Sequence, residues 1–359
     1  MKRSKKYDFI ITGLGIAGAL LSFFLLKKNK KILVFDNREN SSSQVAAGII
    51  NPITGQRMVK TWYADELFPI AEKTYKEMED FLGIKIIQKV NILRVLNSMF
   101  EQNEWLTKSS DPLNAMYMKN KITLFNDIMI NAPFGFGEVT YSSVINFKHI
   151  IKGMREKLLT MGCLVGEKIN YNQIKIDEVV TVMNFTAKKI IFCEGVGATE
   201  NPFFNYLPFI PSKGEILTIK CDELNLESIV SKGIFILPLG NKLFKVGSTF
   251  DWDDKNPLPT EKAKKELVSK LNGLLKLPYK IMEHEAGIRP SVRDRRPFVG
   301  VHPKYAQFYI LNGLGTKGAL LAPYFANQLV EHIDNGKPLH IEADIKRFDK
   351  LRNKAKNNS

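Results

Sequence analysis

The sequence contains few residues of the types that build disulfide frameworks or metal sites. Its 359 residues include 3 cysteines and 5 histidines. Cys163, Cys193 and Cys221 lie far apart, none belongs to a C-x-x-C pair, and the histidines form no pair with metal-ligand spacing. We therefore predict neither a disulfide framework nor a metal site.

Long apolar segments are equally rare. Residues 9–26 form the one uncharged run close to the roughly 20 residues that cross a membrane, and the basic residues before it resemble the start of a signal peptide. However, this run contains three glycines, no A-x-A-like cleavage site follows it, and lysines come next at positions 27, 28, 30 and 31. A membrane or export segment is therefore the less favoured interpretation, and we expect a cytoplasmic protein that spans no membrane.

Acidic residues are outnumbered by basic ones, 37 to 52, which leaves a net charge of +15. Part of this excess lies at the two ends of the chain. Such a surface attracts anionic partners, nucleic acid included. Runs of charge are more often solvated surface, and that interpretation is preferred. The hydrophobic content of 44% supports a sizeable core, and the length allows two domains or one domain with an insertion.

Residues 7–36 show the order strand, glycine turn, helix, strand and acidic residue. Apolar runs at 9–11 and 32–35 predict the strands, and the apolar segment 16–26 predicts the helix. Gly13, Gly15 and Gly18 stand between them in G-x-G-x-x-G spacing. This order is typical of the phosphate-binding turn in a dinucleotide-binding domain.

Each part of this unit has a physical role. Gly13 permits the tight turn, Gly15 lets the backbone approach a pyrophosphate, and Gly18 lets the helix pack closely on the strand. The start of the helix offers N–H groups and a positive dipole end to the phosphates. Asp36 can accept hydrogen bonds from the hydroxyls of an adenosine ribose.

Later segments also contain small or glycine-rich stretches that suit a bound ligand. Residues 45–52 are small and apolar, which suits a backbone packed against a ligand. A buried strand at 189–193 ends in a glycine-rich turn, residues 287–300 are rich in arginine and glycine, and a last strand at 308–311 leads into residues 312–318 and a helix. Apolar periodicity predicts further helices at 65–82, 146–162, 260–271 and 318–333, and one beyond residue 340. Residues 84–139 and 207–248 are predicted to form strands and turns.

In this order and spacing, the motifs resemble the D-amino-acid-oxidase (DAO) family of FAD-dependent oxidoreductases, the group with glycine oxidase and sarcosine oxidase. The resemblance covers nearly the whole chain. It rests on the N-terminal unit, on residues 190–198, on GIRP at 287–290 with RDRRPFVG at 293–300, and on NGLGTKG at 312–318. The last two motifs look closest to the FAD oxidase half of the bifunctional tRNA wobble-uridine-modifying enzyme. Its methyltransferase half is not expected here, because the flavin motif begins at residue 8.

The resemblance implies an α/β fold with a Rossmann-type FAD-binding domain and a discontinuous, strand-rich (α+β) substrate domain. We expect the FAD-binding domain to comprise residues 1–83, 140–205 and 285–359, and the substrate domain residues 84–139 and 206–284. FAD is expected to be noncovalent, because no cysteine lies within residues 222–359. The residues expected to contact it are Gly13, Gly15, Ile16, Ala17, Gly18, Asp36, Asn37, Ala46, Ala47, Gly48, Glu194, Gly195, Gly197, Gly287, Arg289, Gly313, Leu314, Gly315, Thr316, Lys317 and Gly318.

Two of these residues are also predicted to act in catalysis. A guanidinium such as that of Arg289 can hold a carboxylate through two parallel hydrogen bonds, and Pro290 after it restricts the backbone. Lys317 can place a positive charge beside the flavin, where the loop's N–H groups also stabilise negative charge. A structural Arg289 and a solvent-facing Lys317 are the alternatives.

The reaction implied is oxidation of a C–N bond next to a carboxylate, by hydride transfer from a small amino acid or N-substituted glycine to flavin. The main alternative substrate is the glycine-like side chain of a tRNA wobble uridine. A non-catalytic FAD-binding protein is a third hypothesis, and an NAD-dependent dehydrogenase is less favoured. Six aromatic residues are candidates for the walls of a substrate site, although most of them are expected to lie in the core: Trp62, Tyr63, Tyr141, Phe235, Phe250 and Trp252. The sequence indicates no oligomeric state.

Overall fold

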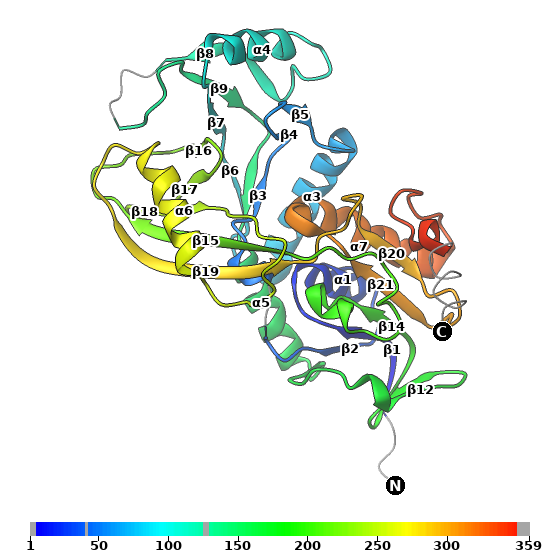
Figure 1. The fold of residues 1–359 in the computed structure, drawn as a ribbon. Coiled ribbons are helices and arrows are strands. Elements are labelled where there is room, and N and C mark those ends of the chain that lie inside the picture. Colours follow the sequence, from blue (N-terminus) through cyan, green and yellow to red (C-terminus); the bar gives the residue numbers. More distant parts are fainter. Residues whose placement is uncertain (1–4, 40–41, 125–128, 350–359) are drawn as a thin grey trace.

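The chain folds around two eight-stranded sheets, which occupy opposite halves of the molecule (Figure 1). The computed structural model describes residues 5–39, 42–124 and 129–349. The first sheet has the order β11-β2-β1-β14-β13-β12, and β21 pairs with β14 and with β20. Its strands are β1 (Lys5–Thr12), β2 (Ile32–Phe35), β11 (Leu164–Val165), β12 (Ile174–Ile176), β13 (Val180–Val182), β14 (Phe185–Phe192), β20 (Phe298–Val301) and β21 (Phe308–Asn312).

The centre of the first sheet is parallel. Strands β2, β1, β14 and β21 lie side by side in the same direction. Ile10 and Ile11 of β1 and Ile190 and Ile191 of β14 are completely buried. Parallel strands are covered on both faces, which explains why these segments read as continuous apolar runs. Their carboxyl ends share one edge, so the turns that follow them in the sequence also meet there.

Helices cover this sheet, and one of them contains most of the apolar run at residues 9–26. The run is divided between β1 and α1, and α1 is almost entirely buried, packing against α5 and α7. Within the described ranges, no helix combines the length and the apolar composition needed to cross a membrane. The helices are α1 (Ile16–Lys27), α2 (Ser42–Val45), α3 (Ala64–Leu82), α4 (Met99–Ser109), α5 (Phe147–Thr160), α6 (Glu261–Asn272) and α7 (Gly318–Asn335).

The second sheet has the order β19-β15-β18-β17-β16-β7-β9-β8. It is mainly antiparallel, and its strands come from two separate parts of the chain. They are β7 (Ile92–Val95), β8 (Met118–Thr123), β9 (Phe136–Val139), β15 (Ser212–Lys220), β16 (Ile229–Ser231), β17 (Phe235–Gly240), β18 (Leu243–Gly247) and β19 (Lys280–Arg289). Two smaller sheets join β3 (Ile49–Ile50), β10 (Ser143–Ile145) and β6 (Ile87–Lys89), and β4 (Ile53–Thr54) and β5 (Val59–Lys60).

Helix α4 corrects the prediction that residues 84–139 contain only strands and turns. Ser98 caps its first turn by accepting a hydrogen bond from the Glu101 N–H. Its buried residues are only Trp105 and Ser109, so no apolar stripe marks it in the sequence. Trp105 lies directly over Gly137 of β9, where any larger side chain would collide with the indole ring.

The other predicted helices are confirmed to within two residues at most ends. Thr260 caps α6, and Gly83 ends α3 in the left-handed conformation. Of the predicted C-terminal helix, the structure has the short 3-10 turn η4 (Ile345–Phe348), and residues 350–359 lie outside the described part of the chain. The other 3-10 turns are η1 (Tyr171–Gln173), η2 (Gly195–Thr199) and η3 (Gly315–Lys317). The residue limits given above for the two domains stay a prediction.

Candidate active site

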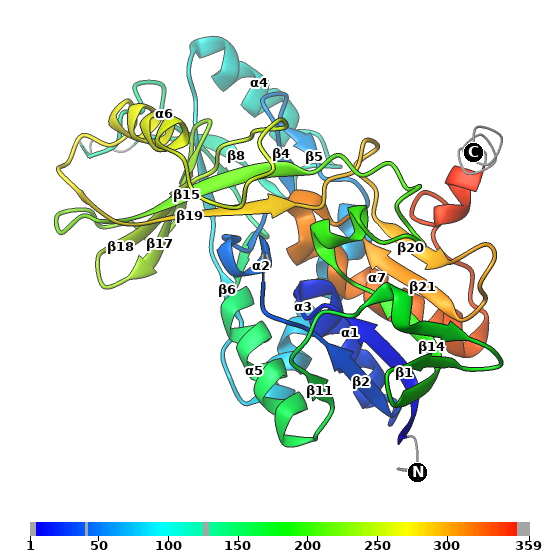
Figure 2. The same cartoon turned by 60° about the horizontal axis from the view of Figure 1, so that its bottom comes forward.

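A cavity of about 1520 Å³ follows the carboxyl edge of the parallel strands and continues to the second sheet. Figure 2 shows this arrangement, with β15 and β19 above the sheet that contains β1, β2, β14 and β21. Ligands of open α/β sheets bind at this edge. The volume exceeds the roughly 300–1,000 Å³ of a typical ligand pocket, as expected of a site for a dinucleotide and a second molecule.

The structure brings the predicted cofactor residues together in this cavity. All of them line it except Gly18 and Gly313, which pack behind the lining. A Cβ atom on Gly18 would lie 2.0 Å from the Gly13 carbonyl oxygen, and one on Gly313 would lie 2.7 Å from the Val292 side chain. Both glycines therefore allow close packing beneath the cavity, the role predicted for Gly18.

The glycine turn after β1 is formed as the sequence indicates. Gly13 has φ +87°, a conformation that favours glycine, and its Cβ position lies 2.5 Å from the Cys193 carbonyl oxygen. Gly15 stands at the N-cap of α1 and offers no capping side chain. The Ser43 hydroxyl, which the sequence analysis did not single out, accepts a hydrogen bond from the Ile16 N–H at 3.2 Å.

Asp36 is held by more partners than the sequence suggested. Its Oδ1 accepts a hydrogen bond from Leu14 N–H at 2.9 Å, and its Oδ2 accepts one from Arg38 N–H at 3.2 Å. Arg155 of α5 also forms an ion pair with Oδ2. Arg155 lies far away in the sequence, so no local motif could identify it. These contacts orient the carboxylate while it lines the cavity.

Glu194, two residues after β14, is a partly buried carboxyl group in this half of the site. The Tyr171 hydroxyl donates to its Oε1 at 3.0 Å, and the Asn201 amide donates to its Oε2 at 2.8 Å. Burial raises the pKa of this carboxyl group above its ordinary value, and the two donors oppose that rise. These contacts hold the turn containing Gly195 and Gly197 against the cavity.

The donor set fits FAD. The N-termini of α1 and α7 both reach the cavity, and each carries about +0.5 elementary charge from its aligned peptides. Neither helix is capped by the side chain of its own N-cap residue, and Ser43 occupies only the Ile16 N–H of α1. One positive end suits a diphosphate, Asp36 suits the ribose beside it, and the second positive end suits a ring system that becomes negatively charged on reduction.

Lys317 lies at the start of α7 and lines the cavity. Its Nζ donates to the Thr61 hydroxyl at 3.1 Å. Burial, together with the nearby positive charges of Arg295 and Arg296, lowers the pKa of Lys317 to about 8. Its ammonium group therefore changes charge close to neutral pH, which distinguishes it from an ordinary surface lysine.

Arg289 ends β19 and faces the other part of the cavity. Its Nη1 donates to the Lys213 carbonyl at 3.2 Å, and its Nη2 donates to the Ser248 hydroxyl at 2.9 Å and the Thr249 carbonyl at 3.2 Å. The Phe250 ring lies 4.4 Å from its guanidinium carbon. Burial lowers the pKa of Arg289 to about 10, so it remains charged at neutral pH.

The side chain of Arg289 occupies space that a glycine leaves free, and its positive charge has no carboxylate partner among the described residues. It crosses Gly214 of β15, where a Cβ atom would lie 1.8 Å from Nη2. Among the described residues, no carboxylate forms an ion pair with it, and the contacts above use three of its five N–H donors. A partly desolvated cation without an acidic partner favours an anionic ligand beside it.

Of the six aromatic residues predicted as candidate walls of the substrate site, two line the cavity. Phe235 and Phe250 line it. Trp62 and Tyr63 instead pack against His340 and against side chains of α7, and Tyr141 and Trp252 are exposed. Lining residues that the sequence analysis missed include Arg94, Lys232 and Lys255.

The fold and this site define a dinucleotide-binding flavoprotein with an arginine facing the cofactor cavity that has no acidic partner among the described residues. Comparison with known families agrees, since the model described as FAD dependent oxidoreductase matches residues 8–332. The chain therefore belongs to the DAO family of FAD-dependent oxidoreductases, and it is an enzyme whose cofactor is FAD. This family assignment replaces two hypotheses from the sequence, an NAD-dependent dehydrogenase and a non-catalytic FAD-binding protein.

Individual relatives resemble the chain over different lengths. The glycine oxidase of Bacillus licheniformis is 24% identical over 94% of this chain and 95% of its own. The crystal structure of iminodiacetate oxidase from Chelativorans sp. BNC1 has a TM-score of 0.77 at 16% identity, covering 96% of this chain and 98% of its own. The bifunctional tRNA 5-methylaminomethyl-2-thiouridine biosynthesis protein of Marinobacter nauticus is 28% identical over only 34% of this chain and 22% of its own.

Proposed function

We propose that the protein oxidises the C–N bond of a small amino acid or N-substituted glycine whose carboxylate is bound by Arg289. The observation that carries this proposal is the partly buried guanidinium of Arg289, which faces the cofactor cavity without an acidic partner among the described residues. The names of two similar proteins, a glycine oxidase and an iminodiacetate oxidase, support the same class of substrate.

The residues of the chain would bind and orient the substrate. Gly13, Asp36 and the start of α7 would hold FAD, which would supply a two-electron acceptor for the hydride on the carbon next to the nitrogen. Arg289 would fix the carboxylate and so place that carbon, because hydride transfer depends on alignment. The amine loses a proton to solvent, and water hydrolyses the resulting imine to an oxo acid and an amine or ammonia.

Noncovalent binding of FAD is part of the proposal. Cys193 is the cysteine among the cavity-lining residues, and it lies beside Gly13 at the phosphate end. The lining near Arg289 and Lys317 contains no cysteine that could attach a flavin ring.

Anaerobic flavin reduction by a substrate panel tests this function. We expect glycine, N-methylglycine or iminodiacetate to bleach the flavin absorbance, and methylamine to react at least tenfold more slowly, since loss of a charged hydrogen-bond pair costs on the order of 2–5 kcal/mol. Equal rates with and without the carboxylate would contradict the proposal.

A tRNA side chain is the second candidate substrate, favoured by the partial match to the tRNA-modifying enzyme and by the net charge of +15. It predicts that none of the free amines bleaches the flavin. It also predicts binding of unfractionated tRNA that weakens steeply with salt, because basic side chains release counterions from phosphates. Absence of tRNA binding at low salt would remove this candidate.

Lys317 should produce a distinctive pH dependence. Its pKa is lowered to about 8, so its positive charge is present below pH 8 and is lost as the pH rises above it. We expect Lys317→Met to slow flavin reduction on the order of tenfold at pH 7, equivalent to about 1.4 kcal/mol, and the difference from the parent protein to vanish by about pH 9.5.

The ratio of parent to variant rates is measured at each pH, because this cancels the titration of the substrate amine. Lys304→Met is the matched control, since Lys304 is exposed and does not line the cavity. A ratio that stays constant from pH 6 to pH 10 would show that the charge of Lys317 does not act on the reaction.

A further inference from the structure

A buried ion cluster lies directly behind Arg289. Lys213 and Glu215 belong to β15, the strand that pairs with β19, and their side chains are 1% and 2% exposed. Lys213 Nζ lies 3.4 Å from Glu215 Oε1. Two charges withdrawn from water are costly unless their remaining donors and acceptors are satisfied. Neither residue is needed by the reaction proposed above, so the cluster requires another explanation.

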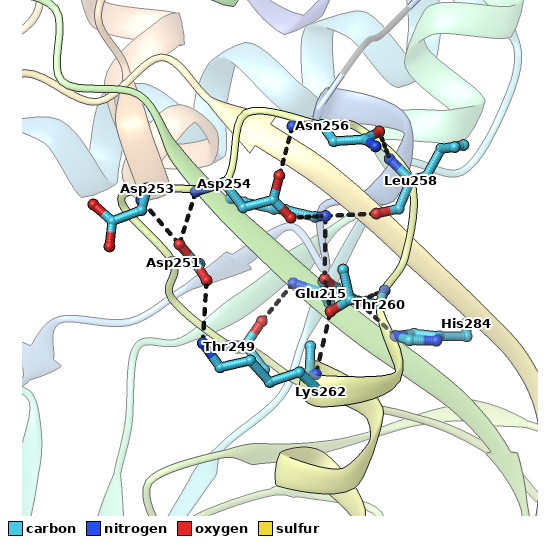
Figure 3. Close-up of polar contacts among 12 residues, drawn as sticks. Glu215, Thr249, Asp251, Asp253, Asp254, Asn256, Leu258, Thr260, Lys262 and His284 are labelled. Carbon is cyan, nitrogen blue, oxygen red and sulfur yellow. Dashed lines mark hydrogen bonds and ion pairs between the residues drawn. The ribbon is translucent and has the colours of Figure 1, made fainter.

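The partners of the cluster come mainly from one segment, residues 248–260, which we call the β18–α6 loop. Lys213 Nζ donates to Asp254 Oδ2 at 2.6 Å and to the Leu258 carbonyl at 2.5 Å. Glu215 accepts hydrogen bonds from the Thr260 N–H at 2.8 Å and from its hydroxyl at 2.9 Å. Figure 3 shows Asp254, Leu258 and Thr260 of this loop around the side chain of Glu215.

His284 of β19 completes the cluster. Its Nε2 lies 2.8 Å from Glu215 Oε2. The carboxylate of Glu215 is therefore approached by Lys213, Thr260 and His284, on three different elements of the structure. Removing any one charge would leave its neighbours buried and incompletely paired.

The beginning of the same loop holds Arg289. Ser248 and Thr249 provide two of its hydrogen-bond acceptors, and Phe250 provides the ring against its guanidinium. The third acceptor is the carbonyl of Lys213 itself. Every polar contact of this guanidinium therefore depends on β15 or on the β18–α6 loop.

Backbone pairing connects the two ends of this arrangement. The N–H of Lys213 donates to the Asp251 carbonyl at 2.7 Å, and the N–H of Asp251 donates back at 3.0 Å. The Thr249 hydroxyl accepts a hydrogen bond from the Glu215 N–H at 2.9 Å. A change in the position of the loop would thus be transmitted to the acceptors of Arg289.

The loop has little apolar burial to hold it in place. The side chains of Phe250 and Leu258 are 56% and 65% exposed, and that of Trp252 is also half exposed. A loop without a buried apolar anchor is readily displaced from the surface. The buried charges of Lys213 and Glu215 supply the missing anchor.

We propose that Lys213 and Glu215 are positioning residues that fix the β18–α6 loop and, through it, the guanidinium of Arg289. Lys213 binds the middle and end of the loop, and Glu215 binds its last residue. This inference rests on the proposed function in one respect, because the orientation of Arg289 affects turnover only if Arg289 binds the substrate.

The first test measures glycolate binding by the holoenzyme, through the change in the flavin absorbance. Glycolate carries the carboxylate but lacks the amine and is not expected to be oxidised. We expect Lys213→Met and Asp254→Asn to weaken glycolate binding about tenfold, within the range of coupling inside one network. FAD content should be unchanged. Asp254 is 31% exposed, so its replacement opens no buried cavity if Lys213→Met fails to fold.

Lys262→Met is the matched control. Lys262 lies at the start of α6, its side chain is 88% exposed, and it approaches Asp251 only at 3.9 Å. It does not line the cavity. This variant should bind glycolate as tightly as the parent protein, although it removes the same charge from the same part of the chain.

The second test measures the loop itself, by the rate of trypsin cleavage after Lys255. We expect faster cleavage in Lys213→Met and Asp254→Asn and the parent rate in Lys262→Met. Parent-like glycolate binding in both cluster variants would overturn the inference, whether or not cleavage becomes faster. Weaker binding with parent-like cleavage would also overturn it, because the loop would then not be the link.

Arg289→Met is included in the same series to separate this inference from the proposed function. If Arg289→Met binds glycolate as tightly as the parent protein, the proposed function fails. The positioning inference is then decided by crystal structures of Lys213→Met and Asp254→Asn. It survives if the guanidinium of Arg289 has moved together with residues 248–250, and it fails if the guanidinium keeps its place.

Discussion

Replacing Arg289 with methionine should lower the efficiency of flavin reduction by roughly 30-fold or more. The guanidinium is partly buried, carries its charge at neutral pH and has no acidic partner among the described residues. Losing one member of a desolvated charge pair costs on the order of 2–5 kcal/mol, and each 1.4 kcal/mol is about tenfold. Stopped-flow reduction by glycine and N-methylglycine provides the measurement.

Two further variants define what Arg289 contributes. Arg289→Lys keeps a positive charge but loses the planar set of N–H donors, so its rate should fall between those of the parent protein and Arg289→Met. Arg293→Met is the control, since Arg293 is exposed and outside the cavity lining. The FAD spectrum should remain intact in all three. If Arg289→Met reduces its flavin as fast as the parent protein, the proposed carboxylate site is wrong.

Replacing Gly18 with alanine should weaken FAD binding roughly 5- to 150-fold. A Cβ atom at this position would lie 2.0 Å from the Gly13 carbonyl oxygen and 3.0 Å from its carbonyl carbon. Backbone atoms cannot move aside as a flexible side chain can, so α1 and the glycine turn must separate. Overpacking of this kind costs about 1–3 kcal/mol, which corresponds to roughly 5- to 150-fold weaker binding. Titration of the apoprotein with FAD measures this effect.

Gly166→Ala is the matched control for this substitution. No atom lies within 4 Å of the Cβ position at Gly166, and this glycine is exposed. Its FAD affinity should equal that of the parent protein. A Gly18→Ala protein that binds FAD normally would mean that the turn tolerates displacement, and the close packing of α1 would then not be required for the cofactor site.

The sequence by itself determined the elements whose signals are local. The strand–turn–helix–strand unit of residues 7–36 is formed as predicted, because its apolar periods, glycine spacing and terminal acidic residue all lie within one short segment. The same applies to α6, where Thr260 supplies the cap just before the periodic stretch. Arg289 and Lys317 line the cavity, and the sequence marks both positions because each lies beside a proline- or glycine-containing turn; their roles stay a prediction.

Only the tertiary structure decided which residues from distant segments meet. Arg155 reaches Asp36, and Lys213 and Glu215 reach the β18–α6 loop, because sheet order and helix packing bring these segments together. The sequence did not predict helix α4, because its burial depends mainly on Trp105, which packs over Gly137 of strand β9. The physical reason is common to these cases. A local pattern records the periodicity of one element, whereas a buried ion pair or a single anchoring side chain depends on the partner that long-range folding places opposite it.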